Sequence, residues 1–321
     1  MRLVFLGSPE PAIIPLKILA EKAREHGHEL VGVVSQPARP VGRKQILQDP
    51  PVAVYAKSLG LPVYQPEKAR DPDFLKDFEA LRPDVAITAA YGQILTPEFL
   101  RIPTRATINI HPSLLPKYRG ATPVPAALLA GEKVSGVTIL FTVQKLDAGA
   151  IILQESSPIG PQECADALTA RYFDLGARLL FPALDKLKDP SFSGIPQDEA
   201  KVTHCRKIDK QDGNVSWSQS AEDINNRFRA FTPWPGSFTF HEGRRLQLTA
   251  MVADPSYLSG QAPGTVTFDR SRGALAVTTG EGTLYLTKVK PAGGKEIPAA
   301  SFWNGLKDRS AVRFSSSDSA T

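Results

Sequence analysis

The chain has 321 residues, of which 42% are hydrophobic and 22% are charged, and its formal net charge is +5. This length is enough for two hydrophobic cores, and no apolar run is long enough to cross a bilayer, which excludes a membrane-spanning protein. Cys164 and Cys205 are far apart and lack Cys or His partners at metal-ligand spacing, so neither a disulfide framework nor a metal site is predicted.

The first half of the chain alternates strand and helix patterns. Residues 1–7 enter an apolar strand at once and leave no room for a signal peptide, so we expect a cytoplasmic protein. Strands are predicted at residues 2–6, 30–35, 85–89, 107–111 and 137–142, and amphipathic helices at 12–26, 51–59 and 122–130. This alternation predicts an α/β fold with a doubly wound, mostly parallel sheet.

The first strand-to-helix connection lacks the glycines of a dinucleotide site. It contains Gly7-Ser8-Pro9-Glu10, and no GxxxxGK[ST] phosphate loop occurs elsewhere. We therefore expect no nucleotide or redox cofactor.

Residues 36–50 form an unusually long connection after the second strand. Arg39, Arg43 and Lys44 lie there among Pro and Gly residues, and the segment is expected to be a loop too polar to pack. A solvated excursion and a basic binding loop are both compatible with this composition.

Three polar side chains follow apolar strand patterns. Asn109 and His111 are two residues apart at the end of the strand at 107–111, which places both on one face at the carboxyl end of the predicted sheet, where open α/β sheets bind ligands. Asp147 follows the strand at 137–142, and a carboxylate there could orient and charge-stabilise the imidazole. Spacing alone favours a structural interpretation, because such residues also satisfy backbone groups and form turns.

The second half of the chain changes pattern. A long helix is predicted at 165–187, and the Pro, Ser and Gly residues that follow are typical of a linker. Short strands at 245–252, 264–268, 275–279 and 283–288 predict a small β-barrel. Residues 206–321 hold 15 Lys and Arg against 11 Asp and Glu, so most of the net charge is in this part. Such a surface attracts phosphates, although +4 is also an ordinary solubilising charge.

Several motifs resemble the 10-formyltetrahydrofolate-dependent formyltransferases, and the similarity covers nearly the whole chain. The motifs are Asn109-Ile110-His111-Pro112-Ser113-Leu114-Leu115-Pro116, Leu146-Asp147-Ala148-Gly149, Arg119-Gly120-Ala121-Thr122-Pro123, Val215-Ser216-Trp217 and Ala230-Phe231-Thr232-Pro233-Trp234-Pro235, together with the segments at 35–44, 90–95 and 290–295. The resemblance implies a Rossmann-like formyltransferase domain at 1–188, a linker at 189–205, an OB-like tRNA-binding domain at 206–314 and a disordered tail at 315–321.

The resemblance also implies an activity, which is transfer of a formyl group from 10-formyltetrahydrofolate to the α-amine of initiator methionyl-tRNA for translation initiation. Asn109, His111 and Asp147 would be catalytic: Asn109 and His111 bind the oxyanion, His111 moves a proton, and Asp147 orients the ring and favours its protonated form, directly or through water. Arg39, Arg43 and Lys44 would contact the tRNA acceptor end. The folate would lie against two segments, made of Ala90, Tyr91, Gly92, Gln93, Ile94 and Leu95, and of Ser113, Leu114, Leu115 and Pro116.

Other interpretations remain open. The segment at 113–116 is equally compatible with a simple turn. The enzyme could formylate a sugar-nucleotide amine or hydrolyse 10-formyltetrahydrofolate, and a non-catalytic RNA-binding protein on the same fold is the alternative from another class. No heptad pattern predicts association, so a monomer that binds initiator methionyl-tRNA and folate, with no membrane partner, is expected.

Overall fold

The computed structural model describes residues 1–42 and 44–316, which form two compact units. The first unit comprises Met1–Pro123, Val134–Ile159 and Ala167–Arg206, and the second comprises Val124–Lys133, Gly160–Asp166 and the chain from Lys207 onward. Residues 189–205, expected to be a linker, thus belong to the first unit. Two of them form strand β11 (His204–Cys205), which pairs in parallel with β8 (Arg119–Gly120).

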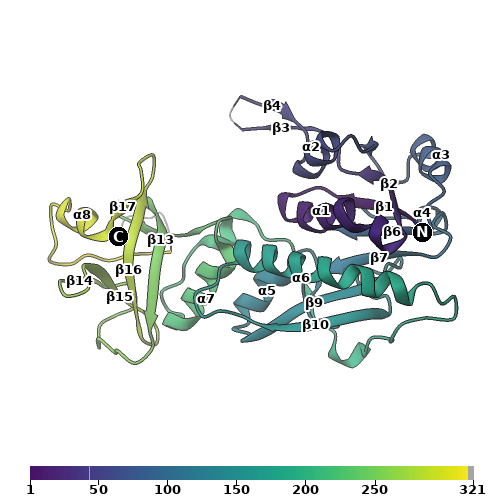
Figure 1. The fold of residues 1–321 in the computed structure, drawn as a ribbon. Helices are drawn as coiled ribbons and strands as arrows, with labels where there is room; N and C mark the ends of the chain where they lie inside the picture. Colours follow the sequence, from purple (N-terminus) through teal and green to yellow (C-terminus); the bar gives the residue numbers. More distant parts are fainter. Residues whose placement is uncertain (43, 317–321) are drawn as a thin grey trace. The chain divides into compact units, whose positions relative to one another are not determined.

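The first unit is built on a seven-stranded sheet (Figure 1). In order across the sheet, its strands are β10 (Ile151–Pro158), β9 (Val134–Phe141), β7 (Ala106–His111), β6 (Val85–Ala89), β1 (Arg2–Gly7), β2 (Glu29–Val34) and β5 (Val63–Tyr64). The strands from β7 to β5 pair in parallel, whereas β9 and β10 pair antiparallel. The predicted mostly parallel α/β sheet is confirmed, and β10 and β5 are additions to its predicted strands.

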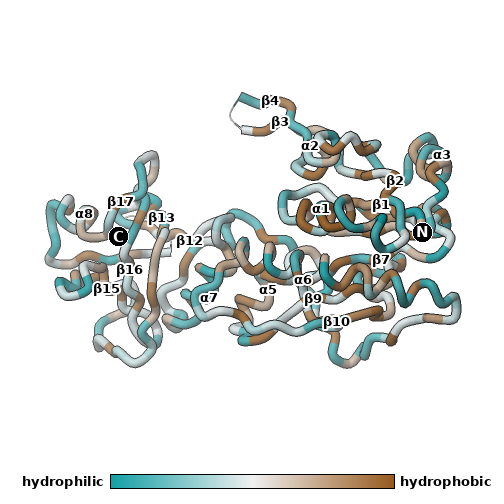
Figure 2. The backbone as a smooth tube through the Cα atoms, viewed as in Figure 1, coloured by the Kyte–Doolittle hydropathy of each residue, from teal (hydrophilic) through white to brown (hydrophobic). Residues whose placement is uncertain are grey.

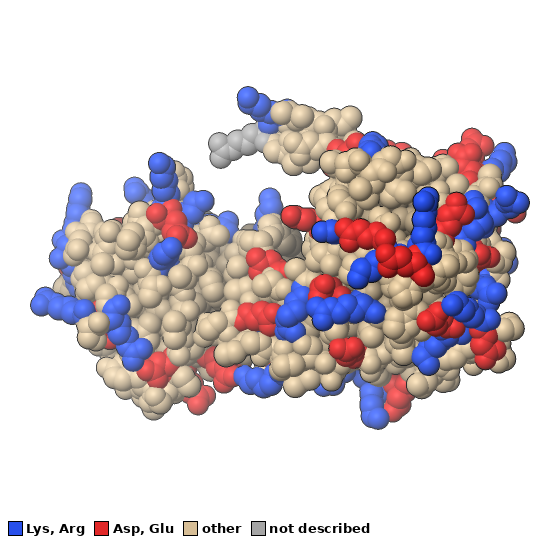
Figure 3. Space-filling model, viewed as in Figure 1, with Lys and Arg blue, Asp and Glu red and all other residues tan. Residues whose placement is uncertain are grey.

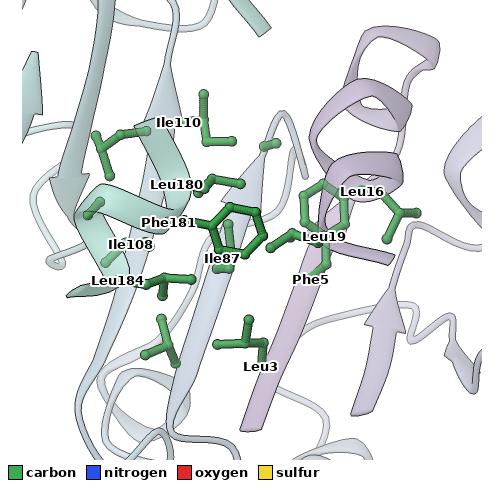
Figure 4. Close-up of a cluster of buried hydrophobic side chains, with 14 of the residues drawn as sticks. Leu3, Phe5, Leu16, Leu19, Ile87, Ile108, Ile110, Leu180, Phe181 and Leu184 are labelled. Atoms are coloured by element: carbon green, nitrogen blue, oxygen red, sulfur yellow. The ribbon is translucent and has the colours of Figure 1, made fainter. Parts of the chain in front are cut away.

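Helices cover both faces of this sheet because its strands are apolar on both sides. In β1, Leu3 and Phe5 belong to one core and Val4 and Leu6 to the other, as the two-residue period of a strand requires. The helices α1 (Ile13–Lys22), α2 (Pro51–Ser58) and α6 (Ala165–Lys186) pack on the first face, where Figure 4 shows side chains of α1 and α6 around those of β1, β6 and β7. The helices α3 (Pro72–Ala80) and α4 (Pro97–Leu100) cover the second face. The apolar colouring of α1 in Figure 2 reflects this burial.

The connection at 36–50, predicted to be a loop too polar to pack, contains a short β-hairpin whose described strand residues are all exposed. It contains β3 (Arg39–Val41) and β4 (Ile46–Gln48), which pair antiparallel. Ile46 and Leu47 are exposed in the hairpin, so its strands carry apolar as well as basic side chains. The hairpin projects from α2 and the rest of the first unit (Figure 1).

The second unit contains an antiparallel sheet that closes into a barrel. Its strands, in order, are β12 (Ser237–His241), β13 (Arg244–Asp254), β16 (Thr283–Pro291), β15 (Ala274–Thr278) and β14 (Val266–Asp269), with β17 (Ile297–Pro298) paired to β16. Residues 312–315 close the barrel, because Ser315 pairs with Phe240 of β12 and Arg313 pairs with Thr265 beside β14. The predicted C-terminal β-barrel is confirmed.

Helices α5 (Pro123–Leu129), α7 (Ala221–Phe231) and α8 (Ala299–Asn304) accompany the strands. The sequence patterns did not predict α7 or α8, although Ser220 caps α7 by accepting a hydrogen bond from the backbone N–H of Asp223.

The tail that was expected to be disordered from residue 315 is bonded to the second unit at its first two residues. Ser315 exchanges backbone hydrogen bonds with Phe240, and the carbonyl of Ser316 accepts a hydrogen bond from Asn214 Nδ2. The rest of the expected tail, residues 317–321, lies outside the described residues. No helix in the described part of the chain is long and apolar enough to cross a membrane.

Candidate active site

Strand β7 carries Asn109 and His111 to its carboxyl end. The strand lies between β6 and β9, with Asn109 beside Thr88 of β6 and Leu140 of β9, and it ends before the Pro112-Ser113 turn. His111 is buried, as is the apolar Ile110 between the two polar residues. The sheet therefore fixes the backbone of both polar residues, as the sequence predicted.

Asn109 is held by hydrogen bonds at both ends of its amide. Its Oδ1 accepts a hydrogen bond of 2.8 Å from Thr88 Oγ1, and its Nδ2 lies 3.5 Å from Asp147 Oδ1 as a donor. The carbonyl of Ile108 lies 3.1 Å from the same hydroxyl and shares its single proton. The carboxamide therefore has one orientation, with its N–H groups on the side of Asp147.

Asp147 reaches Asn109 and His111 from the loop between β9 and β10. Its Oδ2 accepts a hydrogen bond of 2.9 Å from the backbone N–H of Gly120 and lies 3.7 Å from His111 Nδ1. Its backbone has a φ of 50°, a left-handed conformation that Asp tolerates better than most residues. The structure thus brings all three polar side chains together.

The imidazole of His111 faces an acceptor on each side. Its Nε2 lies 3.1 Å from the carbonyl oxygen of Tyr118, and because a carbonyl can only accept, Nε2 carries a proton and donates it. In the neutral ring Nδ1 is then unprotonated and lies on the side of the Asp147 carboxylate. Nδ1 is therefore the nitrogen that can gain and lose a proton.

Burial dominates the pKa of His111. Desolvation lowers this pKa below its ordinary value, while the negative charge of Asp147 and the hydrogen bond to Tyr118 act in the opposite direction without cancelling it. The charge of Asp147 favours the protonated ring, as expected, but this effect is outweighed by burial, because the ring is almost completely removed from solvent. A neutral His111 can act as a base near neutral pH.

The loop at residues 90–95 keeps backbone donors available. Ala90 and Gly92 have φ of 49° and 81°, and the Tyr91 carbonyl accepts hydrogen bonds from Ser8 Oγ and Gln36 Nε2. Among the residues that the structure describes, none accepts a hydrogen bond from the backbone N–H of Gly92 or Ile94. Ile94 is 86% exposed, so this loop presents an apolar side chain beside these backbone donors.

The segment at residues 113–116 differs, because its polar groups are bonded within the protein. Ser113 Oγ donates to the carbonyl of Lys117, and the Ser113 carbonyl accepts from Thr138 Oγ1. The backbone N–H of Leu115 donates to Thr138 Oγ1, and its carbonyl accepts from Gln154 Nε2. These contacts are those of a packed turn, and the backbone groups of Ser113 and Leu115 are already used.

Comparison with known proteins identifies the family of the chain. Residues 1–184 match the family profile described as "Formyl transferase", and residues 207–307 match "Formyl transferase, C-terminal domain". The chain belongs to the formyl transferase family. The resemblance found in the sequence is thereby confirmed.

Curated relatives match this formyl transferase along its whole length. The methionyl-tRNA formyltransferases of Roseiflexus castenholzii and Moorella thermoacetica are 42% and 39% identical to it, and the matches cover 96% and 95% of this chain and 96% of each relative. The crystal structure of HypX from Aquifex aeolicus in complex with tetrahydrofolic acid shares its fold, with a TM-score of 0.64 and 18% identity over 97% of this chain and 50% of HypX.

Two of the three basic residues predicted to bind tRNA, Arg39 and Lys44, lie on the β3–β4 hairpin of this formyl transferase. Arg39 is at the start of β3, where its Nη2 forms an exposed ion pair of 2.7 Å with Glu67 Oε2. Lys44 is exposed at the turn. Arg43 lies outside the described residues.

Three residues that support the site of this formyl transferase were not singled out from the sequence. Thr88 is a polar residue inside a buried apolar strand, and that anomaly could have indicated it. Gly120 belonged to a quoted motif, but its backbone donor could not be inferred. Gln197 lies in the expected linker, and it donates to the carbonyls of Asp147 and Gly149, a contact across some fifty residues that no local pattern signals.

Proposed function

We propose that this enzyme transfers the formyl group of 10-formyltetrahydrofolate to the α-amine of initiator methionyl-tRNA. The observation that carries the proposal is the convergence of an amide, an imidazole and a carboxylate at the carboxyl end of β7. The full-length similarity to proteins named methionyl-tRNA formyltransferase supports the choice of acceptor.

The reaction makes one C–N bond and breaks another. The uncharged amine of methionyl-tRNA attacks the formyl carbon, the carbonyl oxygen becomes an oxyanion, and the amine then loses a proton. Collapse of this tetrahedral intermediate expels N10 of the folate, which takes up a proton. The products are formylmethionyl-tRNA and tetrahydrofolate, and no oxidant, reductant or nucleotide is consumed.

Asn109 supplies a donor to the oxyanion. One Nδ2–H is directed to Asp147, and the second is left to bind an oxygen that becomes negative during the reaction. A donor fixed in advance stabilises developing charge without reorganisation, and such a donor typically contributes about 10²- to 10³-fold in kcat.

His111 carries the proton between the two nitrogens. With Nε2 bound to Tyr118, Nδ1 takes the proton from the attacking amine and returns it to the departing folate nitrogen. The ring becomes an imidazolium in between, and the Asp147 carboxylate 3.7 Å away stabilises that charge. This order of events needs a histidine that is neutral at the start, which agrees with its lowered pKa.

The loop at 90–95 is proposed to bind the pterin through its free backbone N–H groups and the exposed Ile94 side chain. For residues 113–116 we propose a smaller contribution, restricted to the partly exposed side chains of Leu114 and Pro116, because the backbone of that turn is engaged elsewhere.

The hairpin and the C-terminal barrel are proposed to bind tRNA. Arg39, Arg43 and Lys44 would attract the acceptor end, and Lys and Arg side chains are spread over the visible face of the second unit (Figure 3). We further propose that residues 206–314 act as one tRNA-binding domain and that the enzyme works as a monomer in the cytoplasm, where charged tRNA is used.

A formyl-transfer assay on the purified chain tests the proposal. Radiolabelled 10-formyltetrahydrofolate is incubated with initiator methionyl-tRNA, elongator methionyl-tRNA or no tRNA, and label in formylmethionyl-tRNA is counted beside released formate. Rapid transfer to the initiator alone is expected. Formate release without tRNA labelling would show that the enzyme is a hydrolase and not a transferase. No turnover would refute both activities.

The hairpin is tested by substitution at two positions. Arg43→Ala and Lys44→Ala are each expected to raise KM for tRNA and leave KM for the folate unchanged, with a shallower salt dependence of tRNA binding. Unchanged tRNA kinetics in both variants would remove the hairpin from the binding surface.

A further inference from the structure

Gln197 holds the loop that carries Asp147. Its Nε2 donates hydrogen bonds of 2.7 Å to the carbonyl of Asp147 and 2.8 Å to the carbonyl of Gly149. An amide nitrogen has two hydrogens, so both are used on this one loop. The carbonyls on either side of Ala148 are thereby fixed to a segment about fifty residues later in the chain.

A buried arginine sets the orientation of the Gln197 amide. Arg119 is completely buried, and its Nε and Nη2 donate to Gln197 Oε1 at 3.0 and 2.9 Å. A guanidinium only donates, so the oxygen of the amide must face Arg119 and the nitrogen must face the loop. Arg119 Nη2 also bonds Glu199 Oε1 at 2.7 Å, and hydrogen bonds from Arg119 and then Lys145 lower the pKa of Glu199 to about 2. Glu199 therefore stays ionised and keeps the arginine in place.

The loop has a conformation that needs such support. Asp147 has a φ of 50°, which is unfavourable for a residue with a side chain. Gly149 lies so close to β9 that a Cβ would be 1.7 Å from the carbonyl oxygen of Phe141. The loop therefore folds tightly against the strand, and the two carbonyls bound by Gln197 flank its tightest point. A shift of this backbone would move the Asp147 carboxylate relative to His111.

We propose that Gln197 is a positioning residue for the reaction, acting through the backbone of Asp147. The proposal rests on the proposed function, since it takes Asp147 as the partner of the catalytic imidazole. Gln197 sets the distance between the Asp147 carboxylate and His111 Nδ1, and thereby the pKa of His111 and the stabilisation of the imidazolium. Displacement of a catalytic group by about 1 Å can cost about 100-fold in rate.

The first test combines steady-state kinetics with an NMR titration of the full-length protein. Gln197→Met keeps the side-chain length and removes both donors. The expected result is a fall in kcat of about 10- to 100-fold, with KM for folate and tRNA within 3-fold of wild type. The His111 Cε1–H signal, assigned with His111→Gln, is expected to titrate at lower pH than in wild type, because the carboxylate that raises its pKa has moved.

Arg105→Met is the matched control. Arg105 Nη1 also donates to two backbone carbonyls, those of Leu187 and Lys188, but it lies just before β7, at the end opposite His111. This substitution is expected to lower stability and leave kcat and the His111 titration unchanged. Equal effects of the two variants on kcat and on the titration would reduce Gln197 to a structural residue and overturn the proposal.

A double-mutant cycle with Asp147→Asn gives an independent answer. If Gln197 acts through Asp147, adding Gln197→Met to Asp147→Asn costs less than 3-fold further in kcat, whereas additive losses would overturn the proposal. If Gln197→Met does not fold, Gln197→Glu replaces it in the cycle, because it keeps the acceptor for Arg119 and loses the donors. Absence of formyl transfer by the wild type would refute the proposed function alone, since the NMR titration tests the inference without turnover.

Discussion

Asp147→Asn removes one charge from the candidate site and changes the volume of the side chain little. The Asp147 carboxylate lies 3.7 Å from His111 Nδ1, and both side chains are buried. At an effective dielectric constant of about 20, the attraction between a carboxylate and an imidazolium at that distance is about 4 kcal/mol. Each 1.36 kcal/mol changes a rate tenfold, so kcat is expected to fall on the order of 10³-fold.

The same substitution also disturbs the hydrogen bonds around Asn109. The carboxylate accepts from Gly120 N–H on one oxygen and from Asn109 Nδ2 on the other. An amide has only one oxygen, so one of these donors would face an N–H₂ group, while Thr88 keeps Asn109 from rotating. We expect a loss of about 1–3 kcal/mol in the free energy of unfolding in addition to the kinetic effect.

Single-turnover formyl transfer measures the chemical step, and urea unfolding measures the stability. Asp84→Asn is the control, because that carboxylate accepts a hydrogen bond from the backbone N–H of Arg2 and one from the Thr104 hydroxyl, just before β6 and so at the end of the sheet opposite the site. It should lose stability and retain its rate. A folded Asp147→Asn enzyme with a rate within tenfold of wild type would show that the charge does not stabilise the imidazolium.

Three further predictions follow from the geometry. Thr88→Val removes the donor to Asn109 Oδ1. It is expected to lower kcat about 5-fold, the equivalent of one hydrogen bond of about 1 kcal/mol, and to leave KM unchanged. A kcat within 2-fold of wild type would mean that Asp147 alone orients the amide. Gly149→Ala places a Cβ against the Phe141 carbonyl and should lower kcat at least 10-fold, whereas Gly60→Ala, at a φ of 69° with no heavy atom within 4 Å of the added Cβ, should cost only about 1 kcal/mol of stability. Burial lowers the pKa of His28 and His111 in the folded protein, so below about pH 6.5 the unfolded chain binds more protons than the folded one. The free energy of unfolding should therefore fall as the pH drops. Equal urea midpoints at pH 5.5 and 7.5, or the same dependence of stability on pH in His28→Phe, would contradict this.

The sequence predicted those parts of the site that depend on regular structure. Asn109 and His111 are placed by the two-residue period of β7, and Asp147 could be assigned to the same region because it follows a neighbouring strand. The long apolar strands of the first unit have strong local patterns, and their parallel pairing follows from the helices between them. The family resemblance then selected Asn109, His111 and Asp147 as the candidate catalytic residues.

The parts that sequence patterns missed depend on contacts between distant segments. Gln197 supports Asp147 from a stretch whose Pro and Gly residues are typical of a linker. The buried Arg119, which donates hydrogen bonds to Gln197, is 78 residues earlier in the chain. The β3–β4 hairpin was missed because short exposed strands bury too little to show an alternating pattern. Predicting the direction in which the pKa of His111 shifts required knowledge of how deeply the ring is buried, which the spacing of residues does not reveal.

Barrel closure protects the backbone groups at the two edges of the C-terminal sheet. Strands β12 and β14 would be the two open edges of the C-terminal sheet, each with unpaired backbone groups, if residues 312–315 did not pair with Phe240 on one side and Thr265 on the other. Exposed edges of this kind add strands from other chains and lead to aggregation. Residues 312–315 therefore cover both edges of the sheet, and a chain cut before Val312 would keep Asn109, His111 and Asp147 but would expose two strand edges that favour aggregation.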